Sequence, residues 1–369
     1  MVNHKPTFIK EGNTQILVYK KKQSNKGPGS KANIPFYNPS MEKNRDFSIL
    51  IAQWMNKCQK RHLSFIDGLA ASGIRGIRIA NEVHGDFTVT INDWDKKSYL
   101  LIKKNIKKIN NGRIISSNKN LNTILSEKKY DYIDIDPFGS PIYFIDSAFR
   151  SIKNNGIIAC TATDTAPLCG VYAKVCLRRY NARPFHSPIM HEIGLRILLG
   201  CIAKNAARYD KTISPIASIY SDHYFRVYFS IKESKKMTNE NLKKIYAIKP
   251  EDYFSSFKKP RKNIGPLWMG KIQDKKINKK LLEILSNKNI GTKKELWRLL
   301  ETLIEEADMP PFYHISDEMA SNLKVSTPSL KTIFSKLRSQ GFKVSRTHFC
   351  NNGIKTNASE EDIKQIFFE

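Results

Sequence analysis

Cysteine is scarce and scattered in this chain of 369 residues. No two of its six cysteines form a Cys-x-x-Cys pair. Disulfide frameworks and four-cysteine zinc sites need closely and regularly spaced cysteines. The spacing therefore argues against both, predicts no metal site, and is typical of reduced thiols in a cytoplasmic protein: Cys58, Cys160, Cys169, Cys176, Cys201 and Cys350.

Long apolar segments are also missing. No run approaches the ~18 residues that a membrane-spanning helix needs. The start of the chain, Met1 to Lys10, is polar and lacks the apolar core of a signal peptide. We therefore expect no membrane contact and a cytoplasmic location, and we expect a monomer.

Acidic residues are few beside basic ones. Lys and Arg number 62 against 34 Asp and Glu, which gives a formal net charge of +28. An excess of this size favours a polyanionic partner, because Lys and Arg release counterions from phosphates when they bind. Segments such as Lys20–Asn33 predict a basic loop, although a lysine run can also be mere solvated surface.

Strand-like and helix-like segments alternate through the first part of the chain, which predicts a parallel sheet with crossover helices. Two further apolar segments, Ile216–Tyr220 and Tyr224–Ile231, flank a short polar turn and predict a hairpin. A hairpin that closes a parallel sheet predicts an α/β, Rossmann-like class I methyltransferase fold, since a symmetric dinucleotide fold would continue with another crossover. The expected parallel strands are Leu63–Ile66, Phe87–Ile91, Arg113–Ser116, Tyr130–Ile135 and Gly156–Thr163.

Composition changes near residue 235, where Lys and Asn become frequent and helical patterns replace strands. We expect a catalytic domain over 1–235 and a smaller α+β domain over 236–369. Lys293–Ile304 and Thr327–Gln340 are expected helices, and the second begins Thr-Pro, which suits an N-cap followed by proline in the first turn. This last helix resembles that of a winged-helix module, and an ordinary small helical domain fits equally well.

A turn of small residues follows the first expected strand, from Asp67 through Gly68 to Gly73. Such a turn lets the backbone approach a ligand at the start of a helix. The spacing is not Gly-x-Gly-x-x-Gly, so nicotinamide or flavin binding loses support. An acidic residue before small residues suits a ligand with an amino-acid end, and Asp67 would accept from its ammonium group. A turn made only for packing would look similar.

Asn92 and Asp93 lie at the end of the second expected strand. A carboxylate ~20 residues beyond a glycine turn reaches ribose hydroxyls in folds of this kind. Asp95 is a rival for this role, and Asp93 could also cap the next helix. The combined positions of the turn and Asp93 predict S-adenosylmethionine as the cofactor.

The tetrapeptide Asp136-Pro137-Phe138-Gly139 follows the expected strand Tyr130–Ile135. Amino-group methyltransferases carry an Asp/Asn-Pro-Pro-aromatic motif at this place. An exocyclic amine on a base is a poor nucleophile, and a carboxylate that accepts its N–H bonds and then its proton makes it reactive. Pro137 would fix the turn and Phe138 would stack on the base. An Asp-Pro turn that only closes a strand is the alternative.

Taken together, several segments resemble the tRNA (guanine-26-N2) dimethyltransferase family, in its archaeal form. The resemblance implies methyl transfer from S-adenosylmethionine to the exocyclic N2 of guanine 26 in tRNA, with tRNA as partner. It rests on Phe36–Asp46, Asp67–Ala80, Asp134–Pro141, Thr163–Gly170, Leu177–Tyr180, Ser221–Val227, Gly265–Trp268 and Gly353–Thr356.

Residue roles follow from this resemblance. It implies that Arg45 and Arg75 contact S-adenosylmethionine and that Asp93 holds its ribose. It makes Asp136 the catalytic carboxylate, with Phe138 and Phe36 against the base.

The chain departs from the family in two places. Where members usually carry Asp-Ala to read the adenine, this sequence has Asn120-Leu121, and Asn can still accept from the adenine amino group. Many members also have a four-cysteine zinc cluster after the catalytic domain, but no cysteine lies between Cys201 and Cys350, so we expect no zinc.

Other polar groups carry weaker hypotheses. Arg178 and Arg179 suggest a phosphate contact, although a solvated face would look alike. Asp164 either touches substrate or caps a helix, and His191-Glu192 favours helix packing over a metal site. The alternatives to the main hypothesis are an amino-group methyltransferase acting on another RNA or on DNA, and a nucleic-acid-binding protein without catalysis.

Overall fold

The structure, a computed structural model, describes residues 6–19, 35–109, 111–221, 223–249, 253 and 262–368. The basic loop predicted at Lys20–Asn33 lies outside these residues, as does Asp222 in the predicted hairpin turn.

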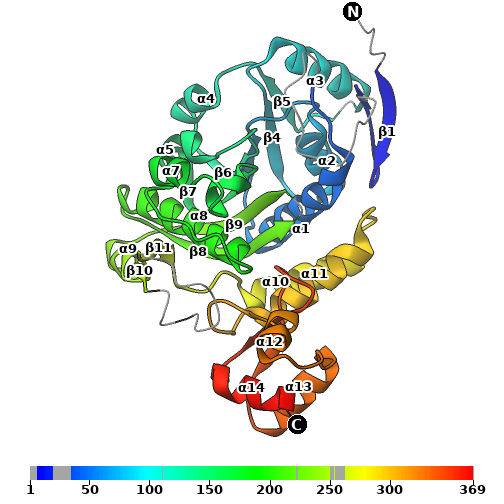
Figure 1. Cartoon of the computed structure of the whole chain (residues 1–369). Coiled ribbons are helices and arrows are strands. Elements are labelled where there is room, and N and C mark those ends of the chain that lie inside the picture. Colours follow the sequence, from blue (N-terminus) through cyan, green and yellow to red (C-terminus); the bar gives the residue numbers. More distant parts are fainter. Residues whose placement is uncertain are drawn as a thin grey trace, which may run out of the picture.

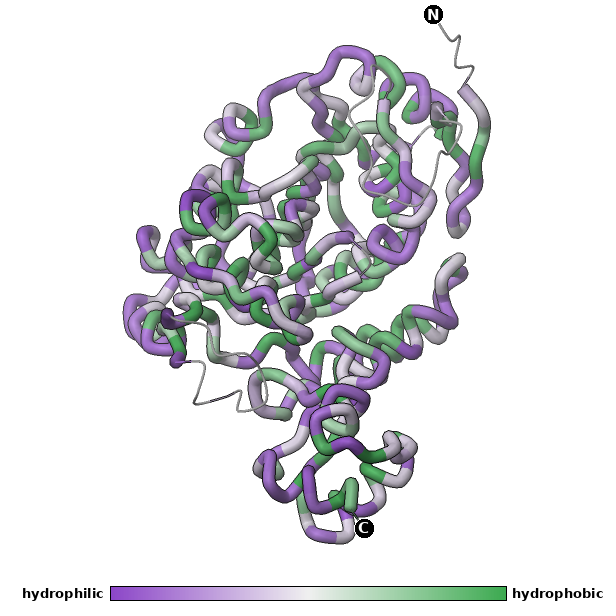
Figure 2. Tube along the Cα trace, viewed as in Figure 1, coloured by the Kyte–Doolittle hydropathy of each residue, from purple (hydrophilic) through white to green (hydrophobic). Residues whose placement is uncertain are grey.

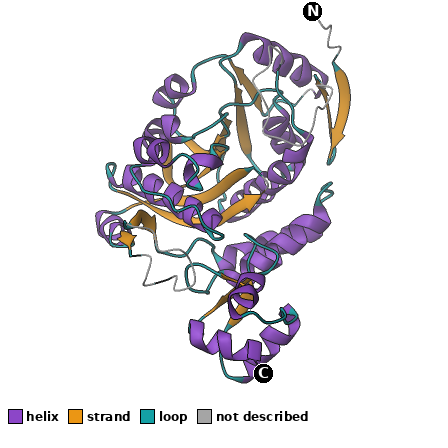
Figure 3. Cartoon of the chain, viewed as in Figure 1, coloured by secondary structure: helices purple, strands orange, loops and turns teal. Residues whose placement is uncertain are grey.

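A seven-stranded sheet forms the centre of the molecule, with strand order β5-β4-β3-β6-β7-β9-β8 (Figures 1 and 3). Neighbours from β5 to β7 pair in parallel, and β9 pairs antiparallel with both β7 and β8. This confirms the predicted class I methyltransferase fold with its closing hairpin. The strands are β3 (Leu63–Asp67), β4 (Phe87–Asn92), β5 (Ile114–Ser117), β6 (Tyr130–Ile135), β7 (Ile152–Ala162), β8 (Lys211–Ser221) and β9 (Tyr224–Glu233).

Alternate side chains of the strands enter two separate cores, because successive residues of a strand point to opposite faces. In β6, Ile133 and Ile135 pack on one face while Tyr132 packs on the other. The apolar residues therefore concentrate around the sheet, and the outer turns of the helices are polar (Figure 2).

Helices cover both faces of the sheet. The first core is closed by α4 (Leu121–Glu127), α5 (Ile142–Ser151) and α8 (Met190–Ala207). The second is closed by five helices, of which two come from the C-terminal part of the chain: α1 (Glu42–Cys58), α2 (Ile74–Glu82), α3 (Lys96–Ile109), α10 (Lys275–Ser286) and α11 (Lys293–Glu306).

Small elements complete this body. The hairpin β1 (Thr7–Glu11) and β2 (Thr14–Val18) packs on α2 and α3. After the β8–β9 hairpin, β10 pairs with β11, so strands as well as helices follow residue 235, as expected for an α+β part of the chain. The other short elements are η1 (Pro39–Met41), α6 (Thr165–Leu168), α7 (Ala173–Tyr180), α9 (Lys235–Leu242), β10 (Ile245–Ile248) and β11 (Ile264–Trp268).

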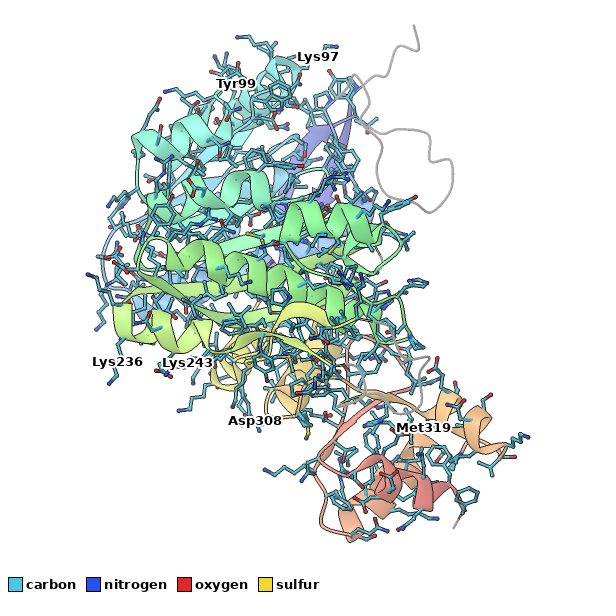
Figure 4. The ribbon with its side chains drawn as sticks, turned by 60° about the vertical axis from the view of Figure 1, so that its left-hand side comes forward. Lys97, Tyr99, Lys236, Lys243, Asp308 and Met319 are labelled. Atoms are coloured by element: carbon cyan, nitrogen blue, oxygen red, sulfur yellow. The ribbon has the colours of Figure 1, made fainter. Side chains whose placement is uncertain are left out.

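The end of the chain has an apolar core of its own, around Met319, Ile333, Leu337 and Ile354. Three strands pair in the order β12-β14-β13 and three helices pack with them. Figure 4 shows Met319 in this part, set apart from the main body. The elements are β12 (His314–Ile315), α12 (Ser316–Leu323), α13 (Leu330–Ser339), β13 (Val344–Arg346), β14 (Gly353–Thr356) and α14 (Glu360–Phe368).

The start of the predicted helix Thr327–Gln340 is wrong by three residues. Helix α13 begins at Leu330 because the Ser329 side chain, not that of Thr327, accepts from the backbone of Thr332 at 3.1 Å and caps it. The predicted domain division at residue 235 stays a prediction.

Candidate active site

The carboxyl ends of β3, β4 and β6 meet at one edge of the sheet. The strand order reverses beside β3, and open α/β sheets bind ligands at such a point. The Asn92 side chain joins the strand ends by donating to the carbonyls of Gly68 and Lys119, both at 3.0 Å. No pattern in the sequence had indicated this role for Asn92.

The turn of small residues is tightly packed here. A Cβ added at Gly68 would lie 2.7 Å from Cδ1 of Leu121 and 2.9 Å from the Asp134 carbonyl oxygen. Gly73, at the start of α2, has a φ of +81°, which favours glycine. The turn therefore needs glycine at both positions for its shape, and the Leu121 side chain packs against it.

Asp67 ends β3 and is buried. Its Oδ2 accepts from the Gly76 backbone N–H at 2.9 Å, which holds the side chain against the start of α2. Burial raises the pKa of Asp67 to about 7, and the carboxylates of Asp134 and Asp136 add to this while Arg75 opposes it. Three carboxyl groups, those of Asp67, Asp134 and Asp136, thus lie close to the buried guanidinium of Arg75.

Asp93 follows β4 and binds the backbone of the glycine turn. Its Oδ2 accepts from the backbone of Ala71 at 2.7 Å, and its Oδ1 accepts from the backbone of Asp95 at 2.9 Å. Burial raises the pKa of this carboxyl group. Trp94, which sequence reasoning passed over, is 65% exposed directly beside it.

Asn120 stands at the start of α4. Its Oδ1 accepts from the backbone of Asn122 at 2.9 Å and so caps this helix. The exposed amide next to the buried Leu121 lies near the end of β5, where Asn118 binds the carbonyls of Asp93 and Trp94 at 2.7 and 3.0 Å.

Asp136 follows β6, and its side chain is 21% exposed. One of its oxygens, Oδ2, pairs with Arg75. Arg75 is buried and also donates to Asn44 Oδ1 and Ser48 Oγ, each at 2.7 Å. Arg75 therefore holds the Oδ2 edge of the Asp136 carboxylate. The rest of this partly exposed side chain remains open to solvent.

Phe138 is half exposed beside this carboxylate. Its ring meets that of Phe36 edge to face, with centroids 4.9 Å apart. The turn after Pro137 is anchored by Thr163, whose Oγ1 accepts from the Gly139 N–H at 2.7 Å and whose N–H donates to the Gly139 carbonyl at 2.9 Å. Gly139 has a φ of +93°, which suits glycine.

A buried ion pair lies behind Asp136, and sequence reasoning missed it. Arg226 of β9 donates to both oxygens of Asp134, at 3.0 and 2.6 Å, and to Thr161 Oγ1 at 2.9 Å. Neighbouring cations hold the pKa of Asp134 below its usual range despite burial, which raises it. The sequence signal was a charged residue among apolar neighbours in each strand, Asp134 between Ile133 and Ile135 and Arg226 between Phe225 and Val227.

Arg45 is held elsewhere. Its guanidinium pairs with Glu11 of β1 and donates to the Asn38 carbonyl at 3.1 Å. Burial favours a raised pKa for Glu11, but the bonds and charge of Arg45 lower it below its usual value. Among the described residues, no hydrogen bond or ion pair joins Arg45 to Asp67, Asp93 or Asp136.

The rim beyond Thr163 is formed by Asp164 and α7. Asp164 makes no side-chain bond that caps α6, so the capping hypothesis is wrong. Instead it accepts from Arg179 at 3.0 Å and from the Tyr180 hydroxyl at 2.7 Å. Burial raises the pKa of Asp164. Arg178 is exposed on α7.

His191 and Glu192 lie within packed structure. The His191 ring stacks on Tyr220 with centroids 3.8 Å apart, and burial lowers its pKa to about 4.

Among the residues that the structure describes, no group of three or more His, Cys, Asp or Glu side chains is placed to hold a metal ion. Within the same residues no helix is long and apolar enough to span a bilayer.

Known proteins resemble this chain over nearly its whole length. The N2,N2-dimethylguanosine tRNA methyltransferase family matches residues 12–367. The tRNA (guanine(26)-N(2))-dimethyltransferase of Pyrococcus furiosus is 38% identical, with 97% of each chain covered, and that of Methanobrevibacter smithii is 36% identical, with 90% of each covered. Trm1 from Pyrococcus horikoshii in complex with S-adenosyl-L-methionine superposes with a TM-score of 0.86 at 34% identity and covers 98% of this chain and 99% of its own. The chain belongs to the N2,N2-dimethylguanosine tRNA methyltransferase family.

Proposed function

We propose that this chain transfers methyl groups from S-adenosylmethionine to the exocyclic N2 of guanine 26 in tRNA, giving N2-methylguanosine and then N2,N2-dimethylguanosine. The observation that carries the proposal is Asp136. Its carboxylate is partly exposed at the end of a central strand, is fixed by Arg75, and lies beside the half-exposed ring of Phe138.

The charges at the strand ends suit S-adenosylmethionine. Three carboxylates, of Asp67, Asp134 and Asp136, surround two buried arginines, so the cluster favours a cationic ligand. Asp67 Oδ2 binds Gly76, and no hydrogen bond among the described residues engages Oδ1. Asp67 would bind the cofactor's ammonium group and Asp93 its ribose. When bound, the cofactor supplies an electrophilic methyl group.

Four further residues are proposed to contact the cofactor. Arg45 and Arg75 would bind its carboxylate, and each would share its guanidinium with the carboxylate that it already holds. Asn120 and Leu121 would border the adenine at the start of α4.

Asp136 would activate the base. Its free edge would accept an N–H of the guanine amine, which directs the nitrogen lone pair toward the methyl group, and would then take the proton. Pro137 fixes the turn, and Phe138 with Phe36 would hold the guanine ring. One N–H remains after the first transfer, so the same carboxylate can act a second time.

Basic residues would grip the tRNA at two places. Arg178 and Arg179 lie on the rim of the site, and Lys331 and Arg338 are exposed on α13 of the C-terminal part. The order β12, α12, α13, β13, β14 supports the hypothesis that residues 236–369 include a winged-helix-like tRNA-binding domain. We further propose a cytoplasmic monomer that functions without zinc.

Nucleoside mass spectrometry tests the function. Transfer RNA incubated with the protein and S-adenosylmethionine should gain N2-methyl- and N2,N2-dimethylguanosine, and tRNA with guanine 26 replaced by adenine should gain neither. Equal methylation of the replaced tRNA would contradict the assignment of position 26. Methylation of ribosomal RNA or DNA alone would favour the alternative amino-group methyltransferases.

A further inference from the structure

Helix α7 and the turn before it present an outer surface that is both apolar and basic. Val171 is 55% exposed, Tyr172 59% and Leu177 50%. From Thr165 to His191 the sequence contains no Asp or Glu. Exposed apolar side chains that gather in one place are typical of a binding surface.

The cations of this surface are available to a partner. Lys174 and Arg178 are exposed, and among the described residues neither has an ion-pair partner. Arg179 differs because Asp164 holds it at 3.0 Å. Asp164 also binds the hydroxyl of Tyr180, whose ring is buried, whereas the ring of Tyr172 is exposed. The helix therefore has a side that is anchored to the protein and a side that is open.

This surface continues from the proposed active site. The Tyr180 hydroxyl lies 2.8 Å from Ser140 Oγ, two residues after Phe138. Tyr143, in the first turn of α5, is 65% exposed. Figure 1 shows α5 and α7 in neighbouring positions beside the sheet. The two helices that meet the turn after Phe138 thus each carry an exposed tyrosine ring at their N-terminal end, Tyr143 on α5 and Tyr172 before α7.

We propose that Tyr172 and Tyr143 form a stacking platform for the nucleotides that flank the target guanine, with Lys174 and Arg178 on their phosphates. The proposal rests on the proposed function. A base within folded RNA must be turned out to reach Asp136, and its neighbours then lose stacking partners. Aromatic rings replace that stacking without regard to sequence, and adjacent cations track the backbone.

Paired substitutions test the platform. Tyr172→Ala and Tyr143→Ala should each raise the KM for tRNA roughly tenfold and leave kcat at saturating tRNA largely unchanged. Tyr172→Phe and Tyr143→Phe keep the ring and should behave as wild type, which a role through the hydroxyl would not permit. Tyr246→Ala, an exposed tyrosine on the separate β10–β11 sheet, is the matched control and should leave KM unchanged.

Direct binding separates this proposal from the proposed function. Tyr172→Ala should weaken tRNA binding in a filter assay, and Arg178→Ala should lower the slope of log affinity against log salt by about one. Unchanged tRNA affinity in both tyrosine-to-alanine variants would overturn the platform, even if wild-type protein methylates guanine 26. Loss of self-association in Tyr172→Ala, seen by sedimentation with tRNA affinity intact, would overturn it in favour of a protein partner. If wild-type protein fails to methylate guanine 26 but its tRNA affinity still depends on the two tyrosines, the proposed function is contradicted and the platform is supported.

Discussion

Two of the buried charge clusters in the described part of the chain invite comparison. One cluster lies at the strand ends, where Asp134 and Asp136 meet Arg75 and Arg226. The other joins α8 to the C-terminal part, where Glu192 meets Arg196 of its own helix and Lys355 of β14, both at 2.8 Å. The two clusters have similar components and differ in their access to solvent.

The junction cluster is sealed. The side chains of Glu192, Arg196 and Lys355 are at most 3% exposed, and Glu192 also accepts from the Phe312 backbone at 2.9 Å. Burial favours a raised pKa for Glu192, but Lys355 and then Arg196 lower it to about 2. Nearby, Asp308 pairs with Lys271 and Lys275 at the exposed edge seen in Figure 4.

The strand-end cluster leaves one member open, since Asp136 is 21% exposed while Asp134 is fully buried. A sealed ion cluster fixes how elements pack, whereas a cluster with one open carboxylate can also bind a ligand and exchange a proton. Buried pairs of carboxylates and cations thus hold α8 against β14 in one region. In the other region, in our proposal, such a pair positions the catalytic carboxylate of Asp136.

Breaking the junction should have the largest effect on stability. Glu192→Gln keeps the shape but leaves Lys355 and Arg196 without their anion, so we expect the free energy of unfolding to fall by ~3–5 kcal/mol. Denaturant unfolding measures this. Glu283→Gln removes an exposed pair with Lys280 and should change stability by under ~1 kcal/mol. Equal effects of the two variants would contradict the structural role of the junction.

Breaking the strand-end cluster should instead affect the rate. Arg75→Met frees the Asp136 carboxylate from its fixed position, and we expect the single-turnover rate at saturating cofactor to fall by ~10²-fold. Arg61→Met is the control, because Arg61 pairs at 2.6 Å with Asp131 near the opposite end of β6. A rate close to wild type for Arg75→Met would show that Asp136 needs no such support.

The smallest expected effect is a pH dependence of cofactor binding. The pKa of Asp67 is raised to about 7, so without ligand the proton is bound below this pH and the folded state loses stability as pH rises from about 4 to 7. A cationic ligand favours the carboxylate, so the affinity for S-adenosylmethionine should rise by about tenfold between pH 6 and 8 and then level off. Calorimetry at several pH values measures this. Asp67→Asn should remove the dependence, and an unchanged slope would exclude Asp67 as its source.

Much of the fold could be predicted from the sequence because local patterns of apolar and turn residues determine where the strands lie. The strand Tyr130–Ile135 has the predicted bounds, and the glycine turn, Asp93 and Asp136 all lie at strand ends. The partners of the site's arginines were not readable. Glu11, on a hairpin far from Arg45 in sequence, takes its guanidinium, and Arg226 reaches Asp134 across 92 residues.

The sequence pattern also left the C-terminal part ambiguous. Short strands such as β12 contain only two residues and show no alternation. Their pairing depends on contacts such as Lys355 with Glu192, which no local pattern encodes. Residue types at strand ends are therefore predictable, and the ion pairs that orient them depend on the assembled fold.

The role of Asp136 is tested most directly by its replacement with alanine. In a single-turnover assay with tRNA and S-adenosylmethionine, Asp136→Ala should lose ~10²–10⁴-fold in methyl-transfer rate. Calorimetry of the same variant should show cofactor binding largely retained. A methyl-transfer rate equal to that of wild type would contradict Asp136 as the group that orients and deprotonates the guanine amine.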